Sequence, residues 1–407
     1  MRSKRAPYKL DQLGFVGRGR SKHRPRNDPS LYGGEYPFFQ TGDVKGAELY
    51  LRNYSSTYNE KGLAQSKLWR PGTLCVTIAA NIADTSILSV SGCFPDSVVG
   101  FVADPKKSNV FFVKYYLDTL KAAMQSISHG TTQDNLSLEK LLSFDFWVPS
   151  VEEQRKIASV LLAYDDLIEN NARRVEILEE MARRLYEEWF VKFRFPGHED
   201  AVFEKMTINN VADVVRGRSY RSAELVGEGR PFVNLKCVNR DGGYRRDGLK
   251  YYSGKYKAEQ LVSSGDIIMA VTDMTQERRI VARVALVPDL GEQEGVISMD
   301  LVRIVPRDGI PPLYLYSFFR WSDFADNVKN HATGANVLHL HPDLVASYDI
   351  DLPPQEVCKL FAEKVRPAIE LVDVLEKKNA NLRAQRDLLL PKLISGEIDI
   401  SEIPMPT

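Results

Sequence analysis

Two carboxylates and a lysine near position 100 have the chemistry needed to hydrolyse a phosphodiester. Asp96 precedes Asp104, and Lys106 follows Asp104 with one residue between them. Many nucleases use such groups to hold Mg²⁺ and to activate a water molecule. A site of this kind needs a rigid strand, but Pro105 lies between the acid and the lysine and has no backbone N–H to donate to a sheet. The sequence therefore favours a coincidental arrangement, and a magnesium-dependent nuclease is kept only as an alternative function.

Histidines near position 340 form a second candidate group, in this case for binding a metal ion. The group consists of His331, His339, His341 and Asp343. Two histidines separated by one residue place both rings on the same face of a strand, which suits a metal such as zinc. The aligned positions in the first half of the chain, Ser137 and Glu139, do not repeat the pattern. A strand edge or a loop is therefore favoured over a metal site.

Other signatures of catalysis are absent from the sequence. There is no GxxxxGK[ST] phosphate-binding loop, no GxSxG, no HExxH and no GxGxxG that opens a helix after a strand. The Asn/Asp-Pro-Pro-aromatic tetrapeptide of amino-methyltransferases is also missing, because Ile310-Pro-Pro-Leu and Leu352-Pro-Pro-Gln lack both the acid or amide and the aromatic ring. We therefore predict a chain without catalytic residues, without metal ligands and without a cofactor of its own.

Clusters of basic residues are the strongest positive signal. Residues 1–30 contain nine Lys or Arg against two Asp, a local net charge of +7. Arg and Lys bind phosphates or guanine edges and amides pair with adenine, so basic loops that also contain amides, Thr and Tyr favour DNA binding over a purely solubilising role. The DNA-binding candidates are Arg18, Arg20, Lys22, Arg24, Gln40, Lys45, Thr131, Thr132, Gln133, Arg216, Arg218, Tyr220, Arg221, Asn234, Lys236, Arg245, Arg246, Arg278 and Arg279.

The chain repeats itself near its middle. Tyr36-Pro-Phe-Phe-Gln-Thr-Gly-Asp-Val is similar to Arg230-Pro-Phe-Val-Asn-Leu-Lys-Cys-Val, and Phe144-Asp-Phe-Trp-Val-Pro is similar to Tyr348-Asp-Ile-Asp-Leu-Pro. The second pair is separated by 348 minus 144, or 204 residues. Arg18 and Arg20 recur in the same way as Arg216 and Arg218, and a solvated surface has no reason to repeat. A repeat of this length predicts two units of similar architecture.

Each half is predicted to contain a mixed sheet and a helix packed on it. Short β-branched and aromatic runs between Gly, Pro and Asp clusters are typical of strands. The expected strands are residues 74–78, 97–103, 266–272, 279–287 and 301–305. The expected helices on these sheets are residues 110–128 and 312–330.

A long charged segment with a heptad pattern closes each half. Apolar positions alternate in steps of four and three residues from Ile157 to Trp189, and again from Phe361 to Leu393. We predict that the two helices pack on each other along this seam and form part of a surface for docking partner proteins. The seam candidates are Ile157, Leu161, Ile168, Asn171, Val175, Leu178, Leu185, Trp189, Phe361, Val372, Leu375, Asn379, Leu382 and Leu389.

Polar residues and a proline interrupt the two seams. Asn171, Asn379 and Arg386 occupy seam positions, where a polar group that must be satisfied can fix register and orientation. A locally solvated end of the seam explains them equally well. Pro367 removes a backbone hydrogen bond inside the second helix, so the regular helix is expected to begin only at Ala368.

The composition is that of a folded soluble protein with two or three domains. Of the 407 residues 43% are hydrophobic, and 54 Lys and Arg balance 54 Asp and Glu. Zero net charge argues against a histone-like coat but permits local basic patches. The four cysteines form no CxxC pair, no signal peptide is recognisable, and no apolar run is long enough to span a membrane. We expect a cytoplasmic protein with reduced thiols and no membrane association.

Several segments resemble the specificity subunit of a type I restriction-modification enzyme. They include Tyr36 to Val44, His129-Gly-Thr-Thr-Gln-Asp-Asn-Leu-Ser137, Val148-Pro-Ser-Val-Glu-Glu-Gln-Arg-Lys-Ile157, Leu185-Tyr-Glu-Glu-Trp-Phe190 and Leu388-Leu-Leu-Pro-Lys-Leu-Ile-Ser-Gly-Glu397. The second half departs from the pattern, since His331-Ala-Thr-Gly-Ala-Asn-Val-Leu338 lacks the tandem Thr-Gln and Val357-Cys358 replaces Glu-Gln.

The resemblance implies an α+β fold in which two target-recognition domains are separated by two conserved helices that form an antiparallel coiled coil. Residues 1–150 and 204–352 would each read one half of a split target in double-stranded DNA. Residues 151–203 and 353–407 would set the gap and dock two methyltransferase subunits that use S-adenosylmethionine to methylate adenine. Restriction subunits that use ATP and Mg²⁺ would add translocation and cleavage.

Two further alternatives stay open from the sequence. One is an orphan or methylation-only specificity subunit, which would read DNA without directing cleavage. The other is a coiled-coil scaffold that binds only protein, which would show no salt-sensitive affinity for DNA.

Overall fold

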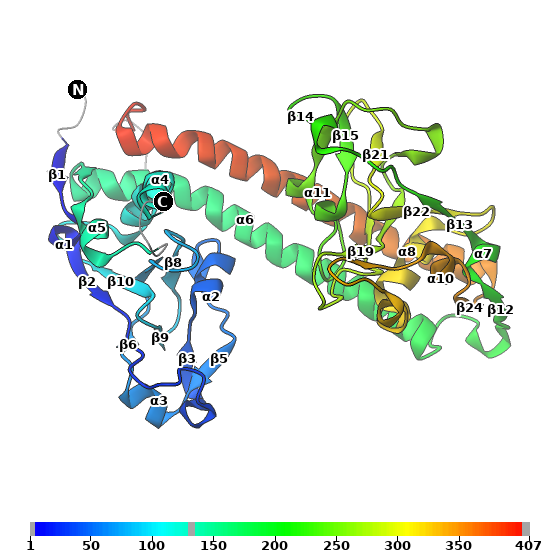
Figure 1. Cartoon of the computed structure of the whole chain (residues 1–407), viewed down its shortest axis with the longest axis horizontal. Helices are drawn as coiled ribbons and strands as arrows, with labels where there is room; N and C mark the ends of the chain where they lie inside the picture. Colours follow the sequence, from blue (N-terminus) through cyan, green and yellow to red (C-terminus); the bar gives the residue numbers. More distant parts are fainter. Residues whose placement is uncertain (1–4, 129–134, 401–407) are drawn as a thin grey trace. The chain divides into compact units, whose positions relative to one another are not determined.

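The computed structural model describes residues 5–128 and 135–400 (Figure 1). The chain divides into two compact units, of which unit 1 consists of residues 1–170 and 381–407 and unit 2 of residues 171–380. Two long helices, α6 (Val151–Tyr186) and α11 (Gln355–Ser395), each contribute one part to each unit. The unit boundaries therefore fall inside these helices, and the segment boundaries expected at 151, 204 and 353 stay predictions.

Unit 1 contains three small sheets. Its strands are β1 (Ala6–Tyr8), β2 (Gly14–Arg18), β3 (Tyr32–Phe38), β4 (Tyr50–Leu51), β5 (Ser56–Tyr58), β6 (Leu68–Trp69), β7 (Leu74–Thr77), β8 (Thr85–Leu88), β9 (Gly92–Cys93), β10 (Val98–Ala103) and β11 (Phe146–Val148). Its other helices are α1 (Leu10–Leu13), α2 (Thr41–Gly46), α3 (Glu60–Ala64), α4 (Val110–Ser128) and α5 (Leu138–Ser143). The strand orders are β2-β10-β7-β8-β4, β5-β3-β9-β6 and β1-β11.

Unit 2 has a similar set of elements. Its strands are β12 (Glu204–Thr207), β13 (Ala212–Arg216), β14 (Leu225–Val226), β15 (Arg230–Val233), β16 (Lys250–Tyr252), β17 (Leu261–Val262), β18 (Ile267–Ala270), β19 (Thr272–Asp273), β20 (Val284–Leu286), β21 (Gly295–Ile297), β22 (Leu301–Pro306), β23 (Leu338–His339) and β24 (Asp349–Leu352). Its other helices are α7 (Ile208–Val211), α8 (Pro312–Trp321), α9 (Phe324–Val328) and α10 (Pro342–Ala346). The strand orders are β13-β22-β18-β20, β14-β16-β15-β21-β17, β12-β24 and β19-β23.

The two units repeat the same connections between strands. The order β2-β10-β7-β8 corresponds to β13-β22-β18-β20, and β5-β3-β9-β6 corresponds to β16-β15-β21-β17. In both units the second of these sheets contains one parallel pair, β3 with β9 and β15 with β21. The small pair β1-β11 corresponds to β12-β24. The predicted architecture of two similar mixed domains is therefore confirmed.

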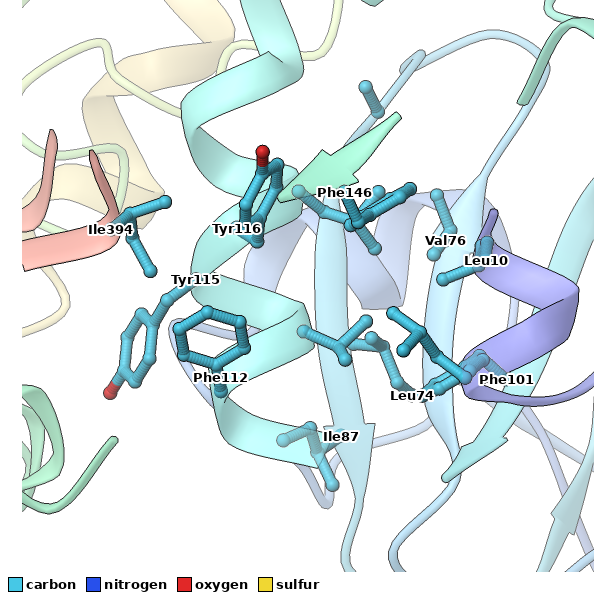
Figure 2. Close-up of a cluster of buried hydrophobic side chains, with 14 of the residues drawn as sticks. Leu10, Leu74, Val76, Ile87, Phe101, Phe112, Tyr115, Tyr116, Phe146 and Ile394 are labelled. Atoms are coloured by element: carbon cyan, nitrogen blue, oxygen red, sulfur yellow. The ribbon is translucent and has the colours of Figure 1, made fainter. Parts of the chain in front are cut away.

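A helix covers the sheet β2-β10-β7-β8-β4 in unit 1, as the apolar pattern of residues 110–128 predicts. Phe112 and Tyr116 of α4 lie in one buried cluster with Leu74 and Val76 of β7 (Figure 2). Ile394 of α11 belongs to the same cluster, so this core continues onto the second long helix.

The long helices run antiparallel. In unit 1, Ile157 near the start of α6 shares a core with Leu393 near the end of α11. In unit 2, the ring of Tyr186 at the end of α6 lies 6.2 Å from that of Phe361 near the start of α11. The predicted antiparallel pair of long helices is therefore confirmed.

The expected start of the second long helix at Ala368 is wrong. Helix α11 begins at Gln355 and continues through Pro367. Phe361, Ala362 and Val365 on the preceding turns are buried, and this packing outweighs the hydrogen bond that the proline removes. Pro367 itself is exposed.

Two other expected elements are shorter than their apolar patterns. The helix expected over residues 312–330 is interrupted after Trp321, because Ser322 adopts an extended conformation and its Oγ accepts a hydrogen bond from the backbone N–H of Phe324 (3.2 Å). The strand expected over residues 279–287 is reduced to β20, since Ala282 has a φ of 62° that a regular strand does not allow.

Two remaining features are the state of the cysteines and the apolar length of the helices. All four cysteines are buried and form no disulfide. Within residues 5–128 and 135–400, no helix is both long and apolar enough to cross a bilayer.

Candidate nucleic-acid interface

An Arg-Gly-Arg sequence begins at the end of the first strand of the sheet β2-β10-β7-β8-β4 in unit 1 and of the sheet β13-β22-β18-β20 in unit 2. In unit 1 Arg18 is the last residue of β2 and lies opposite Val99 of β10. In unit 2 Arg216 is the last residue of β13 and lies opposite Val302 of β22. The structure therefore gives the arginine pair Arg18/Arg20 and the pair Arg216/Arg218 equivalent places in the two units.

The central glycine of each pair is required by close packing of the backbone. A Cβ atom on Gly19 would lie 2.3 Å from the carbonyl oxygen of Phe94, and one on Gly217 would lie 2.0 Å from that of Ser298. Both distances are too short for any side chain. After each strand, the backbone therefore passes in close contact with the segment that precedes the neighbouring strand, which is β10 in unit 1 and β22 in unit 2.

The second arginine of each pair is anchored through its backbone. The N–H of Arg20 donates to the carbonyl of Phe94 (3.0 Å), and the N–H of Arg218 donates to the carbonyl of Ile297 (2.7 Å). The carbonyl of Arg218 in turn accepts from the N–H of Met299 (2.8 Å). Both side chains thus project from a fixed backbone, which reduces the entropy lost when they bind a ligand.

The side chains of the two pairs have no carboxylate partner among the described residues. Arg18, Arg20 and Arg216 are exposed and Arg218 is half-buried. The guanidinium of Arg216 lies beside a histidine, with Nη2 at 3.2 Å from His341 Nε2. The Nε atom of Arg218 is buried without a hydrogen-bond partner. Four positive charges are therefore available to an anionic ligand.

A lysine that the sequence does not single out lies beside the unit 1 pair. Lys67 Nζ lies 3.7 Å from the ring centroid of Trp69 and 4.6 Å from that of Phe15. Burial lowers the pKa of Lys67, and the charge of Arg20 lowers it further. A single lysine between Ser66 and Leu68, outside the basic clusters, gives no sequence signal, because its position beside Arg20 depends on the pairing of distant strands.

Three other candidate arginines are committed to ion pairs within unit 2. Arg245 binds both oxygens of Asp247 at 2.7 Å, Arg279 lies 3.3 Å from Asp241, and Arg246 binds Asp373 of α11. The hydrogen bonds to Asp247 raise the pKa of Arg245. Arg245 and Arg279 also line a groove of about 600 Å³ together with Lys236. The groove brings Lys236, Arg245 and Arg279 together, but the charges of Arg245 and Arg279 are already compensated by carboxylates.

Two candidates in unit 2 have structural roles. Asn234 is buried, and its amide donates to the carbonyls of Phe232 (3.2 Å) and Gly248 (2.8 Å). The ring of Tyr220 packs edge-on against Phe232 with centroids 4.8 Å apart, and burial together with the nearby Asp300 raises the pKa of Tyr220. The Asn234 amide is therefore held in the interior of unit 2, and the partly buried ring of Tyr220 is fixed against Phe232.

The remaining candidates do not converge on one point. Lys22, Gln40 and Arg221 are exposed, and Arg278 is half-buried in a loop with a φ of 56°. Arg24 donates to the carbonyls of Ser21 and His23, and Lys45 donates to the side chain of Asn81 (3.2 Å). Thr131, Thr132 and Gln133 lie outside the described residues.

The alternative nuclease residues are occupied by other contacts. Asp96 accepts two hydrogen bonds from Arg26, at 2.8 and 3.0 Å, and Asp104 accepts one from the backbone N–H of Lys106 (3.0 Å). His341 caps α10, while His339 pairs through its backbone with Thr333. In the part of the chain that the structure describes, no group of three or more His, Cys, Asp or Glu has an arrangement that would hold a metal ion.

The seam positions of the long helices all have low or intermediate exposure. Ile157, Leu161 and partly buried Leu389 belong to the core of unit 1. Trp189 and Phe361 belong to a core in unit 2, with ring centroids 5.7 Å apart. Ile168 and Leu375 are buried, whereas Val175, Leu178, Leu185, Val372 and Leu382 are partly buried.

The polar residues of the seam have partners on the other helix. Asn171 Nδ2 donates to Asn379 Oδ1 at 2.9 Å. Arg386 binds Asp165 of α6, which also accepts a hydrogen bond from the hydroxyl of Tyr115 on α4. Burial is the largest single effect and would lower the pKa of Arg386, but the charges and hydrogen bonds of Asp165 and Asp387 together raise it above its usual value. Asp165 and Tyr115 were not predicted, because Asp165 flanks the apolar seam and Tyr115 lies in a different helix.

Comparisons with known proteins show which family this chain resembles. The model of the type I restriction modification DNA specificity domain matches residues 6–180. The MjaIX type I restriction enzyme specificity subunit of Methanocaldococcus jannaschii is 25% identical, over 97% of this chain and 94% of that protein. The HindI specificity subunit of Haemophilus influenzae is 21% identical, over 67% of this chain and 72% of that protein.

A solved structure supports the same fold. The crystal structure of the type I restriction-modification system S subunit from M. genitalium matches with a TM-score of 0.61 and 15% identity, and the match covers 96% of each chain. This likeness shows the fold, while the family model and the relatives show that the chain is similar to type I restriction-modification specificity subunits, with the specificity domain itself matched over residues 6–180.

Proposed function

We propose that this chain is the non-catalytic DNA-reading subunit of a type I restriction-modification complex. Each unit would read one half of a bipartite target in double-stranded DNA, and the long helices would dock two methyltransferase subunits that methylate adenine. S-adenosylmethionine, ATP and Mg²⁺ would act in the partner subunits. Without restriction subunits the same chain would serve a methylation-only system.

The observation that carries this proposal is the repeated arginine pair. Arg18/Arg20 and Arg216/Arg218 occupy equivalent strand ends in two domains of the same topology, and no carboxylate of the described residues neutralises them. Positive side chains without carboxylate partners on a rigid backbone suit phosphates and guanine edges. A protein-binding scaffold has no need for this charge at the same place in both domains.

The proposal is tested by removing the pair in unit 2. A chain with Arg216→Ala and Arg218→Ala, assembled with its methyltransferase subunit, is expected to bind target DNA about 10- to 100-fold more weakly. The salt dependence of binding should also flatten, by about one unit of slope for each phosphate that the variant no longer neutralises. Fluorescence anisotropy across a salt series measures both quantities.

A matched control is available at the other end of the same strand pair, β13 with β22. Arg307 is an exposed arginine of unit 2 that already binds Asp213 at 2.8 Å. Arg307→Ala should leave both the affinity and the salt slope close to those of the native chain. An Arg216/Arg218 variant that behaves like this control would show that DNA is bound elsewhere.

A further inference from the structure

Two buried polar contacts join the long helices. In unit 2, the Asn171 amide donates to the Asn379 amide oxygen at 2.9 Å, and Asn379 is 4% exposed. In unit 1, Arg386 binds Asp165, whose side chain is 4% exposed and also accepts from Tyr115. Each contact joins α6 to α11, so each helix supplies one member of each polar pair.

Because the two halves of the chain are repeats, each polar residue of the seam has an equivalent position on the other long helix. The helices are related by an offset of 204 residues. The positions equivalent to Asn171 and Asn379 are Leu375 and Val175, and those equivalent to Asp165 and Arg386 are Ile369 and Ala182. Ala182 and Ile369 meet in one apolar cluster in unit 2. All four polar residues therefore have apolar counterparts, and the repeat breaks down where the seam is polar.

Pairing of like helices would separate these partners. If α6 met a second α6 in the same antiparallel register, Asn171 would face Val175 and Asp165 would face Ala182. A buried amide or carboxylate without a partner is strongly unfavourable. The buried groups of α6 can therefore be satisfied only by a different helix.

The same argument applies to α11. In a pair of two α11 helices, Asn379 would face Leu375 and Arg386 would face Ile369. Both polar groups would again lack the partners that they have in this structure. The apolar residues alone would not prevent like pairing, because most seam positions are apolar in both helices.

We infer that the two polar contacts act as a pairing code, so that α6 accepts only an α11 sequence, from the same chain or from a second copy, and neither helix pairs with its own kind. A chain with two similar halves is thereby directed to join its first half to its second. This inference concerns helix pairing alone and holds whether or not the chain reads DNA.

The test moves the asparagine contact to the equivalent position, one helix at a time. The first variant carries Asn171→Leu with Val175→Asn, and the second carries Leu375→Asn with Asn379→Val. Each leaves two asparagines facing apolar residues, so the midpoint of thermal unfolding should fall by several degrees. The third variant combines all four changes, restores an amide pair in the same register, and should recover most of the decrease. Scanning calorimetry of the full-length chain gives the three midpoints.

The combined variant distinguishes a pairing code from independent effects of each substitution on its own helix. Recovery supports the inference even if the single-helix variants do not fold, because the four changes preserve the composition of the seam. Decreases in the midpoint that simply add in the combined variant would overturn it, as would single-helix variants as stable as the native chain. Gln385→Ala, which removes an exposed hydrogen bond to Asn381 on α11, is the control and should leave the midpoint unchanged.

Discussion

Arginine has two separate roles in this protein, and burial distinguishes them. Arg386 is partly buried and is held by Asp165 between two helices. Arg216 is exposed, and its guanidinium lies beside the ring of His341. Removing a buried partner leaves an uncompensated charge, whereas removing an exposed arginine affects mainly ligand binding. Sequence alone does not separate these roles, because both residues lie in segments rich in charge.

The first prediction tests the buried contact of Asp165. Asp165→Ala should lower the free energy of unfolding by about 3 kcal/mol, because Arg386 would be without its main counter-charge in a partly buried place. Tyr115→Phe removes one neutral donor and should cost about 1 kcal/mol. Denaturant unfolding of the full chain measures both.

A control for this prediction lies next to the same arginine. Asp387 also accepts a hydrogen bond from Arg386, at 2.9 Å, but its side chain is 61% exposed. Asp387→Ala should therefore change the free energy of unfolding by less than about 0.5 kcal/mol. Equal effects of Asp165→Ala and Asp387→Ala would mean that burial does not matter at this contact.

At the scale of elements, the sequence predicts what is periodic and misses what depends on distant packing. The alternating steps of four and three place Ile157 and Phe361 on buried faces, and α4 has the bounds that its apolar pattern predicts. Pro367 predicts a helix boundary by a local rule, but burial of Phe361 and Val365 keeps the helix continuous. A rule based on local sequence fails where tertiary packing stabilises the helix by more free energy than the local feature costs.

The second prediction concerns the seam as a support for partner docking. Aspartate in place of both Leu178 and Leu382 puts charge into partly buried seam positions, at a cost of about 3 kcal/mol or more for each. We expect this double variant to unfold at lower denaturant concentration and to fail to assemble with the methyltransferase subunit. Size-exclusion chromatography of the mixed subunits provides the readout for assembly.

A leucine on the outside of α11 separates docking from helix pairing. Leu388 is 69% exposed, so Leu388→Asp should not change the stability of the chain. If Leu388→Asp abolished assembly while the seam variant still assembled, the partner would bind the outer surface of the helix independently of the seam.

At the scale of the whole molecule, the internal repeat can be recognised in the sequence. Which of its arginines form ion pairs cannot. The similarity of residues 36–44 to residues 230–238 predicts two related domains, and the matching strand orders confirm them. The candidate site could be predicted only in part. Arg18 and Arg216 occupy equivalent strand ends, whereas Arg246 binds the carboxylate of Asp373, which is distant in the sequence.

The third prediction is that the two recognition segments act independently. Replacement of residues 1–150 by the corresponding segment of another specificity subunit should change one half of the methylated site and leave the other half unaltered. The physical reason is that each segment folds on its own sheets, so its contacts to DNA do not depend on the sequence of the other. Mapping of methylated adenines in cells that carry the chimaera gives the new site, and a change in both halves would contradict the prediction.

The structure also shows what such a graft must preserve. Tyr115 donates to Asp165, Glu48 binds Arg383, and Arg52 binds Glu169, so these three pairs join the segment to the long helices within unit 1. Removal of the two exposed ion pairs should matter little, but a segment without a hydroxyl at the place of Tyr115 leaves a buried carboxylate short of one donor. A graft that keeps Tyr115 should therefore yield more stable and more active complexes than one that has phenylalanine at that position. If both grafts methylate equally well, Asp165 needs only Arg386, and the recognition segment is free to vary where it meets the helices.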